Sequence, residues 1–274
     1  MPDILFLKIF IVGSLIMNAE PFFPNYPPIC FSIQRVEETG STNDDLKQLA
    51  AAGAPEGTVV LAQRQSGGKG QRGRAFVSQA GGLYMSLLLR PEAPISSALY
   101  LTPMAANAVC AAIEALTELQ PAIKWVNDVY CRQHKVCGIL CEAAPELSTG
   151  KVCYVVMGIG LNIFPPEQGF QGGLEQVAGT LFEDGMDQRV IDRFAECILA
   201  EISKQLRLSR AQVLEQYRSR SLLTGQQVTL QHDQRELTGK VEGITEEFEL
   251  ILRTEDGQRH CFCSGDVILT KYSK

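Results

Sequence analysis

The sequence predicts an α+β protein with a small β-barrel appended at its C-terminal end. Helix-like and strand-like patterns succeed one another up to about residue 220, and short β runs replace them from Ser221 onward. The chain has 274 residues. This length suits one large domain and a small second one, because single cores stop growing near roughly 250 to 300 residues.

The large domain is expected to begin with a helix and two strands. "STNDDLKQLAAAG" predicts a helix that Ser41 or Thr42 caps and Gly53 ends. "GTVVLAQRQ" then predicts a strand, and "GGLYMSLLLRP" predicts another after a glycine-rich stretch. Apolar residues at helical spacing predict a longer helix over about residues 102–119.

Three strands are expected next, "AIKWV", "VCGILCEA" and "KVCYVVMGIGLNI", separated by turns at Asn127-Asp128 and at residues 148–150. "VIDRFAECILAEISKQL" and "AQVLEQYRSR" then predict two helices. The barrel is expected from "QQVTL", "ELTGKVEGI", "FELILRT" and "DVILT", with turns such as Glu255-Asp256-Gly257 between them.

Charge and cysteine content exclude some classes of function. The chain has 25 basic and 31 acidic residues, a net charge of −6, which argues against a surface built mainly to hold nucleic-acid backbones. Nine scattered cysteines suggest a reducing compartment. "HCFC" places Cys261 and Cys263 one residue apart, but without a second pair at zinc spacing, strand positions are the better interpretation.

The first residues leave two interpretations open. "ILFLKIFIVGSLIM", residues 4–17, is short for a membrane span and contains Lys8. It could be a signal peptide, but Asp3 stands where a basic flank is expected. We favour a start at Met17, with the preceding residues not made in the cell.

The stretch "QSGGKGQRGR", residues 65–74, contains a G-x-G-x-x-G pattern around Lys69, Arg72 and Arg74. A dinucleotide-binding fingerprint must open a helix, and a Walker loop must end in Gly-Lys-Ser/Thr. Neither condition is met here. What remains is a flexible loop between two strands that closes over a phosphate, or, as the plainer alternative, a solvated basic loop.

Further motifs favour the phosphate loop and carry a resemblance to a known family. "STN" (41–43), "GKGQRGR" (68–74), "KWVND" (124–128), "KVCGIL" (135–140) and "GIGLN" (158–162) occur in this order over about 120 residues. Together they resemble the biotin protein ligases, whose usual strings are S-T-N, G-R-G-R-x-G-R, K-W-P-N-D, K-x-x-G-I-L and G-I-G-x-N. "SGDVILT" also resembles the family's small C-terminal barrel.

The resemblance implies a fold and a domain division. The fold is the mixed sheet with flanking helices shared by class II aminoacyl-tRNA synthetases and biotin ligases, followed by an SH3-like β-barrel. The domains implied are an extension over residues 1–30, a catalytic domain over residues 31–220 and the barrel over residues 221–274. Some family members carry an N-terminal DNA-binding domain and repress transcription. About thirty residues precede "FSIQRVEETGST", so we expect a ligase without DNA binding.

The resemblance also implies a reaction and its ligands. The family activates biotin with ATP to biotinyl-5′-AMP and passes the biotin to a lysine of a biotin carboxyl carrier protein, such as that of acetyl-CoA carboxylase. ATP and Mg²⁺ are then the expected cofactors and biotin the substrate. We also expect a cytoplasmic enzyme that does not bind a membrane; a homodimer is left open.

Site residues follow from the resemblance, position by position. Lys135 and Arg74 are the expected catalytic residues, because both reaction steps pass through anionic centres. The expected biotin contacts are Ser41, Thr42, Asn43, Gln65 and Gly138. The expected adenylate contacts are Lys69, Gly70, Gln71, Arg72, Gly73, Phe76, Lys124, Asn127 and Asn162. Asp128 is the expected magnesium ligand, and Gly158 and Gly160 are expected to give the ligand clearance.

Plainer roles remain for several of these residues. Ser41 and Thr42 could simply cap a helix, Lys135 could be solvated, and Trp125 could belong to the core or to the pocket wall.

Four positions depart from the family's strings. Gln71 replaces an arginine, which puts retention of the adenylate in doubt. Lys69 replaces an arginine and loses the bidentate fork. Phe76 replaces a tryptophan, and Val126 replaces a proline.

Two competing functions are kept. Lipoate or octanoate attachment shares the catalytic fold, but a transferase that starts from an activated acyl group needs no phosphate clamp. A vitamin-binding regulator without catalysis is the other, and Lys135 with the cationic loop argues against it.

Overall fold

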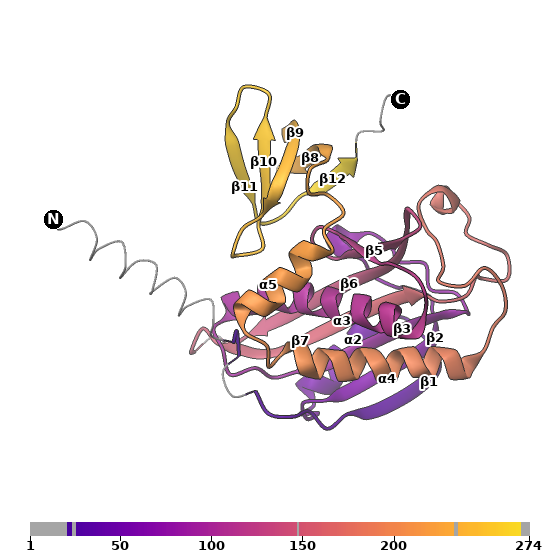
Figure 1. Cartoon of the computed structure of the whole chain (residues 1–274). Coiled ribbons are helices and arrows are strands. Elements are labelled where there is room, and N and C mark those ends of the chain that lie inside the picture. Colours follow the sequence, from indigo (N-terminus) through magenta and orange to yellow (C-terminus); the bar gives the residue numbers. More distant parts are fainter. Residues whose placement is uncertain (1–20, 24–25, 147, 233–234, 270–274) are drawn as a thin grey trace.

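The computed structural model describes residues 21–23, 26–146, 148–232 and 235–269. It shows a seven-stranded mixed sheet with helices and a separate five-stranded antiparallel sheet formed by the C-terminal part (Figure 1). This arrangement confirms the predicted α+β class with an added SH3-like unit.

The large sheet has the order β1-β2-β3-β7-β6-β5-β4. In chain order its strands are β1 (Ser32–Thr39), β2 (Thr58–Gln65), β3 (Gly82–Leu89), β4 (Ala122–Lys124), β5 (Asp128–Cys131), β6 (His134–Pro145) and β7 (Val152–Asn162). Only the pairing of β1 with β2 is parallel among these described strands.

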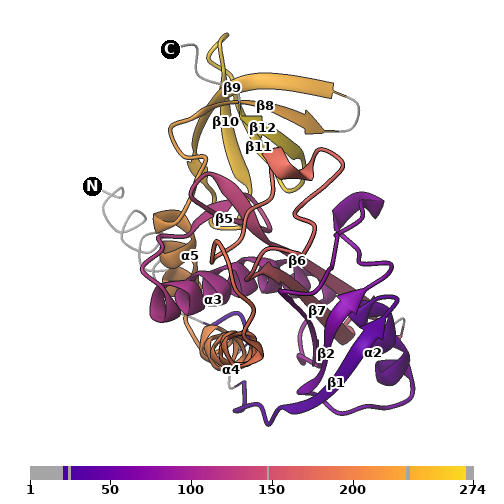
Figure 2. The same cartoon turned by 90° about the vertical axis from the view of Figure 1, so that its right-hand side faces the viewer.

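Helices cover both faces of this sheet (Figure 2). They are α2 (Thr42–Ala51), α3 (Leu101–Leu116), α4 (Gln188–Gln205) and α5 (Arg210–Ser219), with short 3₁₀ helices η1 (Gln71–Gly73), η2 (Ile95–Tyr100) and η3 (Leu174–Gln176). Strand alternation explains the layers. Met85 and Leu87 of β3 join the main core with α3 and α4, whereas Leu88 packs with Leu46 and Ala50 of α2 on the opposite face.

The C-terminal sheet has the order β11-β10-β9-β8-β12. Its strands are β8 (Gln227–His232), β9 (Arg235–Ile244), β10 (Leu250–Thr254), β11 (Arg259–Phe262) and β12 (Asp266–Leu269). Buried contacts attach it to the large domain. Trp125 Nε1 donates to the Phe248 carbonyl at 2.8 Å, and the Phe22 ring stacks on Tyr100 at 4.0 Å and lies 6.0 Å from Phe248. Trp125 is therefore a core residue, one of the two roles left open for it.

Most predicted elements are present, but two strands were not predicted. β1 and β5 are absent from the sequence-based assignment, whereas β11 overlaps the strand positions expected for "HCFC". The predicted turn at Asn127-Asp128 is wrong by one to two residues: the turn occupies Trp125 to Asn127, and Asp128 already begins β5. Helix α3, which was predicted to run to about residue 119, ends at Leu116.

Two predictions concern the N-terminal part, namely the apolar stretch with a start at Met17 and the extension over residues 1–30. The apolar stretch at residues 4–17 lies outside the described residues. Phe22, Phe23 and Tyr26 are buried in the main core, so this part of the extension packs against the large domain.

Among the described residues, one segment, Ile95–Leu116, is long and apolar enough to cross a membrane. It is largely buried under the sheet and against α4, as expected for a core helix.

The cysteines form no bonded or metal-binding cluster in the described part of the chain. All nine are free thiols, and burial raises the pKa of the Cys131 thiol to about 11. The described residues contain no group of three or more His, Cys, Asp or Glu side chains that could hold a metal ion. Cys261 lies on β11, in agreement with the strand interpretation of "HCFC".

Candidate active site

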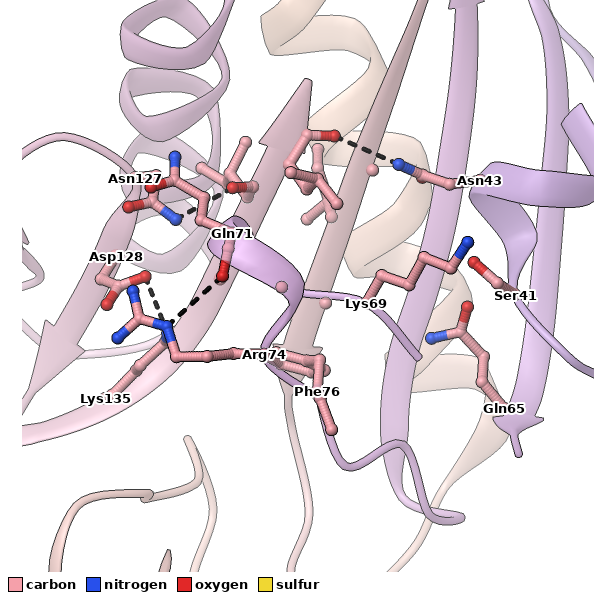
Figure 3. A pocket seen from close by; sticks show the side chains of 18 of the residues that line it. Ser41, Asn43, Gln65, Lys69, Gln71, Arg74, Phe76, Asn127, Asp128 and Lys135 are labelled. Carbon is pink, nitrogen blue, oxygen red and sulfur yellow. Dashed lines mark hydrogen bonds and ion pairs between the residues drawn. The ribbon is translucent and has the colours of Figure 1, made fainter. Parts of the chain in front are cut away.

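A cavity of about 210 Å³ opens on the α2 face of the large sheet. The start of α2, the end of β2, the glycine loop (residues 66–77) and strands β6 and β7 surround it (Figure 3). Its lining includes the predicted site residues Ser41, Thr42, Asn43, Gln65, Lys69, Gly70, Gln71, Arg74, Phe76, Asn127, Asp128, Lys135, Gly138, Gly158 and Gly160. The fold thus gathers predicted site residues that lie up to 119 positions apart in the chain, from Ser41 to Gly160.

One end of the cavity presents neutral hydrogen-bonding groups. Gln65 Oε1 accepts from the Thr42 backbone N–H at 2.8 Å and from the Thr42 hydroxyl at 3.1 Å. Gln65 Nε2 donates to the Ser78 hydroxyl at 2.8 Å. These bonds fix the orientation of the Gln65 amide, so the site is organised before any ligand arrives.

Asn43 extends this network toward the cavity floor. Its Nδ2 donates to Glu142 Oε2 at 2.8 Å and to the Leu140 carbonyl at 3.3 Å. The Ser86 hydroxyl, which is fully buried, lies 2.6 Å from Asn43 Oδ1 and 2.8 Å from Thr42 Oγ1. Because every polar group here has a partner, the buried network is stable without a ligand.

Ser41 is the N-cap residue of α2, yet its side chain makes no capping hydrogen bond. It is buried and lines the cavity instead. Asp44 and Asp45 in the first turn supply the favourable negative charge at this helix end. The capping role that the sequence allowed for Ser41 is therefore not realised.

The opposite end of the cavity is charged. Lys135 Nζ lies 2.7 Å from Asp128 Oδ1 and 6.0 Å from the centre of the Phe76 ring. The Asn127 amide donates to the Ile139 carbonyl at 3.0 Å, which holds its side chain beside Asp128. The Lys135 side chain is 28% exposed, so it is paired and partly buried rather than solvated.

The glycine loop closes the cavity from above β2 and β3. The Phe76 N–H donates to the Gly68 carbonyl at 2.9 Å, and the Gly70 N–H donates to the Arg74 carbonyl at 2.7 Å. Lys69 Nζ lies 2.5 Å from Asp44 Oδ2 on α2. Lys69 and Lys47 lower the pKa of Asp44, so this carboxylate stays charged well into the acid range.

The cavity floor is formed by backbone without side chains. Gly138 of β6 is paired with Gly160 of β7, and Leu140 with Gly158. A Cβ on Gly160 would lie 2.5 Å from the Phe76 ring, and one on Gly158 would lie 2.2 Å from Asn43 Oδ1. Phe76 and Asn43 can take these positions only because glycines lie below them.

Four predicted adenylate contacts do not line the cavity. Arg72 and Gly73 are absent from the lining, and Arg72 pairs with Asp266. Lys124 lies over the Tyr130 ring at 5.8 Å, and burial lowers its pKa although nearby Asp128 opposes this effect. Asn162 donates to the Gly179 carbonyl at 3.1 Å.

Sequence reasoning missed several residues of the site. Ser78, Ser86 and Glu142 hold Gln65 and Asn43, and Leu174 and Val177 line the cavity from the region of η3. Ser86 had a detectable signal, because it is the single polar residue in the apolar run "YMSLLL". Nothing in the sequence around residue 174 indicated a role.

The charged end of the cavity has too few carboxylates to hold a magnesium ion by itself, but it could hold one together with the phosphates of a nucleotide. Asp128 is one carboxylate, whereas protein-bound Mg²⁺ is commonly held by one or two carboxylates plus substrate phosphates and water. The described residues offer no larger acidic cluster. Asp128 would therefore hold the ion jointly with phosphates.

Comparisons with known proteins agree with this geometry. The sequence model described as the Biotin/lipoate A/B protein ligase family matches residues 34–162, and that of the Biotin protein ligase C terminal domain matches residues 223–270. The fold and site thus define a ligase of the biotin and lipoate class.

Individual relatives narrow this class. The chain is 32% identical over 234 residues to the bifunctional ligase/repressor BirA of Bacillus spizizenii, covering 84% of this chain and 71% of that protein. It is 31% identical to the biotin–[acetyl-CoA-carboxylase] ligase of Mycobacterium tuberculosis, covering 85% and 87%. Biotin protein ligase from Aquifex aeolicus, solved with biotin and ATP, superposes with a TM-score of 0.71 at 28% identity, covering 88% and 99%. The chain belongs to the biotin protein ligase family.

Proposed function

We propose that this protein is an ATP-dependent biotin–[acetyl-CoA-carboxylase] ligase. The observation that carries the proposal is the polarity of the cavity. Neutral paired donors and acceptors at Thr42, Asn43 and Gln65 occupy one end, where the Lys69 cation is already paired with Asp44. The cations Lys135 and Arg74 occupy the other end (Figure 3). Biotin has the same polarity, with a neutral ureido head and a carboxylate tail.

In the first step, the biotin carboxylate attacks the α-phosphorus of ATP. A new O–P bond forms, the bond to pyrophosphate breaks, and biotinyl-5′-AMP results. No protein nucleophile is required, because the substrate carboxylate supplies the attacking oxygen. Lys135 and Arg74 bring the two anions together and offset the charge that develops at the phosphorus.

In the second step, the ε-amine of a carrier lysine attacks the acyl carbon and AMP leaves. The carrier lysine loses one proton as its amide bond forms. The expected partner is a biotin carboxyl carrier domain, and the M. tuberculosis and Paracoccus denitrificans relatives are both named for the acetyl-CoA carboxylase. Arg74 and Lys135 would stabilise the departing phosphate here as well.

Magnesium would bind at Asp128 and neutralise phosphate charge during the first step. Asp128 Oδ1 lies 2.7 Å from Lys135 Nζ, so a magnesium ion at Asp128 and the Lys135 ammonium would contact the phosphates of the same ATP molecule.

Lipoate or octanoate attachment is the second candidate, because one matching family model covers biotin and lipoate ligases alike. It is less supported, since two relatives at 30% identity or more that align with most of this chain are named biotin–[acetyl-CoA-carboxylase] ligases.

The deciding experiment is biotin-dependent exchange of labelled pyrophosphate into ATP. We expect exchange with biotin and little with lipoate or octanoate, and a loss of about 100-fold or more in Lys135→Ala. Lys151→Ala, which removes a lysine far from the cavity lining, is the matched control and should leave the rate unchanged. Exchange with lipoate alone would favour the second candidate, and no exchange with any acid would favour a binding protein.

Several finer statements belong to the same proposal. Action in the cytoplasm and the absence of DNA and membrane binding are predictions that the ligase function does not require, and a homodimer is left open. The division at residues 30 and 220 is likewise a prediction, which limited proteolysis of the full chain would test.

A further inference from the structure

The C-terminal sheet contributes one carboxylate to the glycine loop. Asp266, the first residue of β12, lies with Oδ1 2.7 Å from Arg74 Nη2 and with Oδ2 2.9 Å from Arg72 Nη1. One side chain of the small domain thus bridges two arginines that are more than 190 positions away in the chain. Burial by itself would raise the pKa of Asp266, but Arg74 and Arg72 together lower it, so the group is ionised at neutral pH.

The loop backbone is shaped to make this contact. Arg72 has φ of 56° and Gly73 has φ of 74°, both in the left-handed region. A residue other than glycine disfavours this region by about 1 kcal/mol or more. These two consecutive left-handed residues lie where Arg72 leaves the cavity lining and pairs with Asp266 of β12.

The charge balance of this region requires such a counter-ion. Lys135 and Arg74 lie near enough to Lys124 to lower its pKa, and Arg72 joins this group of cations through Asp266, which it shares with Arg74. In the described part of the chain, Asp128 and Asp266 are the two carboxylates that form ion pairs with these cations. Without Asp266, the two guanidinium groups would repel each other and move apart in solvent.

The contact leaves Arg74 able to bind a phosphate. A guanidinium has five N–H donors in a fixed fork. Asp266 occupies Nη2 of Arg74, and Nε points to the Gln71 carbonyl at 3.4 Å. The remaining N–H donors of Arg74 are free to bind a phosphate, because Arg74 lines the cavity. One edge of its guanidinium can therefore pair with Asp266 while another edge binds the phosphate.

We propose that Asp266 is a positioning residue for adenylation, through which the C-terminal sheet holds the loop arginines at the cavity mouth. This inference rests on the proposed ligase function. It assigns the small domain a direct part in binding ATP and in retaining the adenylate. Asp266 touches neither substrate, and it acts through the two arginines, because its pair with Arg72 fixes the loop and its pair with Arg74 orients the guanidinium at the cavity.

The test uses the full-length chain with Asp266→Asn and Asp266→Glu. We expect Asp266→Asn to raise the KM for ATP in pyrophosphate exchange by about ten-fold and to speed release of the adenylate, with the KM for biotin nearly unchanged. Asp266→Glu keeps the charge and should restore most of the loss. A merely structural role would shift both KM values or neither.

Glu242→Gln is the matched control, because Glu242 also joins two arginines, Arg253 at 2.5 Å and Arg259 at 2.9 Å, but within the C-terminal sheet. It should behave as the wild type. Arg72→Gln should reproduce the effect of Asp266→Asn, and the double variant should be no worse than either alone. If Asp266→Asn folds poorly, the Arg72→Gln variant tests the role of the Asp266 ion pairs instead.

The outcomes separate the inference from the function. A wild-type chain without biotin-dependent exchange overturns the proposed function. An active wild type, with Asp266→Asn and Arg72→Gln both keeping a normal KM for ATP and normal adenylate retention, overturns the role of Asp266.

Discussion

At the scale of single residues, two glycines of β7 set the positions of two cavity side chains. Gly158 leaves room for Asn43 Oδ1, and Gly160 leaves room for the Phe76 ring. The consequences of filling these spaces differ, because Asn43 is buried in a fixed network on α2 whereas Phe76 belongs to the glycine loop.

We therefore predict different effects for Gly158→Ala and Gly160→Ala. Gly158→Ala should raise the KM for biotin more than ten-fold and reduce the free energy of unfolding by about 2 kcal/mol, since the Asn43 network cannot move freely. Gly160→Ala should displace Phe76, raise the KM for ATP and reduce stability by less than about 1 kcal/mol. Urea unfolding and exchange kinetics measure both. Equal effects of the two variants on biotin and ATP would contradict this assignment.

Most residues of the site could be predicted from the sequence, because short motifs carry them. Lys135, Arg74, Gln65 and Asn43 line one cavity as the strings suggested. The cavity does not include Lys124, because its side chain turns toward Tyr130. Nor could the sequence reveal Asp266, since an ion pair across more than 190 positions leaves no local pattern.

At the scale of elements, the glycine loop is bound by ion pairs at both ends. Lys69 is held by Asp44 of α2, and Arg72 and Arg74 are held by Asp266 of β12. These pairs are partly exposed, so each contributes little stability and weakens in salt. The loop can therefore open at modest cost and close again over a ligand.

We predict that trypsin cleaves the free protein after Lys69, Arg72 or Arg74, and that biotin with ATP protects these bonds. Raising the salt concentration should speed cleavage of the free form, because it screens the ion pairs. Mass spectrometry of the fragments identifies the sites, and cleavage in other exposed loops serves as the internal control. Equal cutting with and without ligands would show that the loop does not close.

The elements that the sequence failed to predict share a physical reason. β1 lies at the edge of the large sheet and most of its side chains are exposed, so it has no alternation of apolar and polar residues. β5 has four residues, too few for a period to appear. Strands with a buried face, such as β2, β3 and β7, were found where the sequence placed them.

At the scale of the whole molecule, an aromatic cluster joins the N-terminal segment, the large domain and the C-terminal sheet. The rings of Phe22, Tyr100, Tyr217 and Phe248 contact one another in stacked, tilted or edge-to-face pairs, and the Trp125 indole donates to the Phe248 carbonyl. The small sheet is thereby fixed at the end of the large one (Figure 1). This fixed position is what allows Asp266 to reach the loop.

We predict that Trp125→Phe reduces the free energy of unfolding by about 1 to 2 kcal/mol, because it leaves the buried Phe248 carbonyl without its donor. It should also weaken the use of ATP more than that of biotin, since the C-terminal sheet loses a fixing contact. Urea unfolding followed by circular dichroism measures the first effect and exchange kinetics the second. A change below about 0.3 kcal/mol would show that water replaces the indole.

The bare floor of the cavity gives the site an asymmetric response to mutation. At Gly138, Gly158 and Gly160, any single substitution adds atoms and none removes them, so point mutations there can only narrow the cavity. Acceptance of a bulkier acid must arise elsewhere, at a lining residue with a side chain to lose, such as Leu140 or Phe76. A library randomised at the three glycines should therefore yield losses alone, and variants with broader substrate range should come from the walls and the loop.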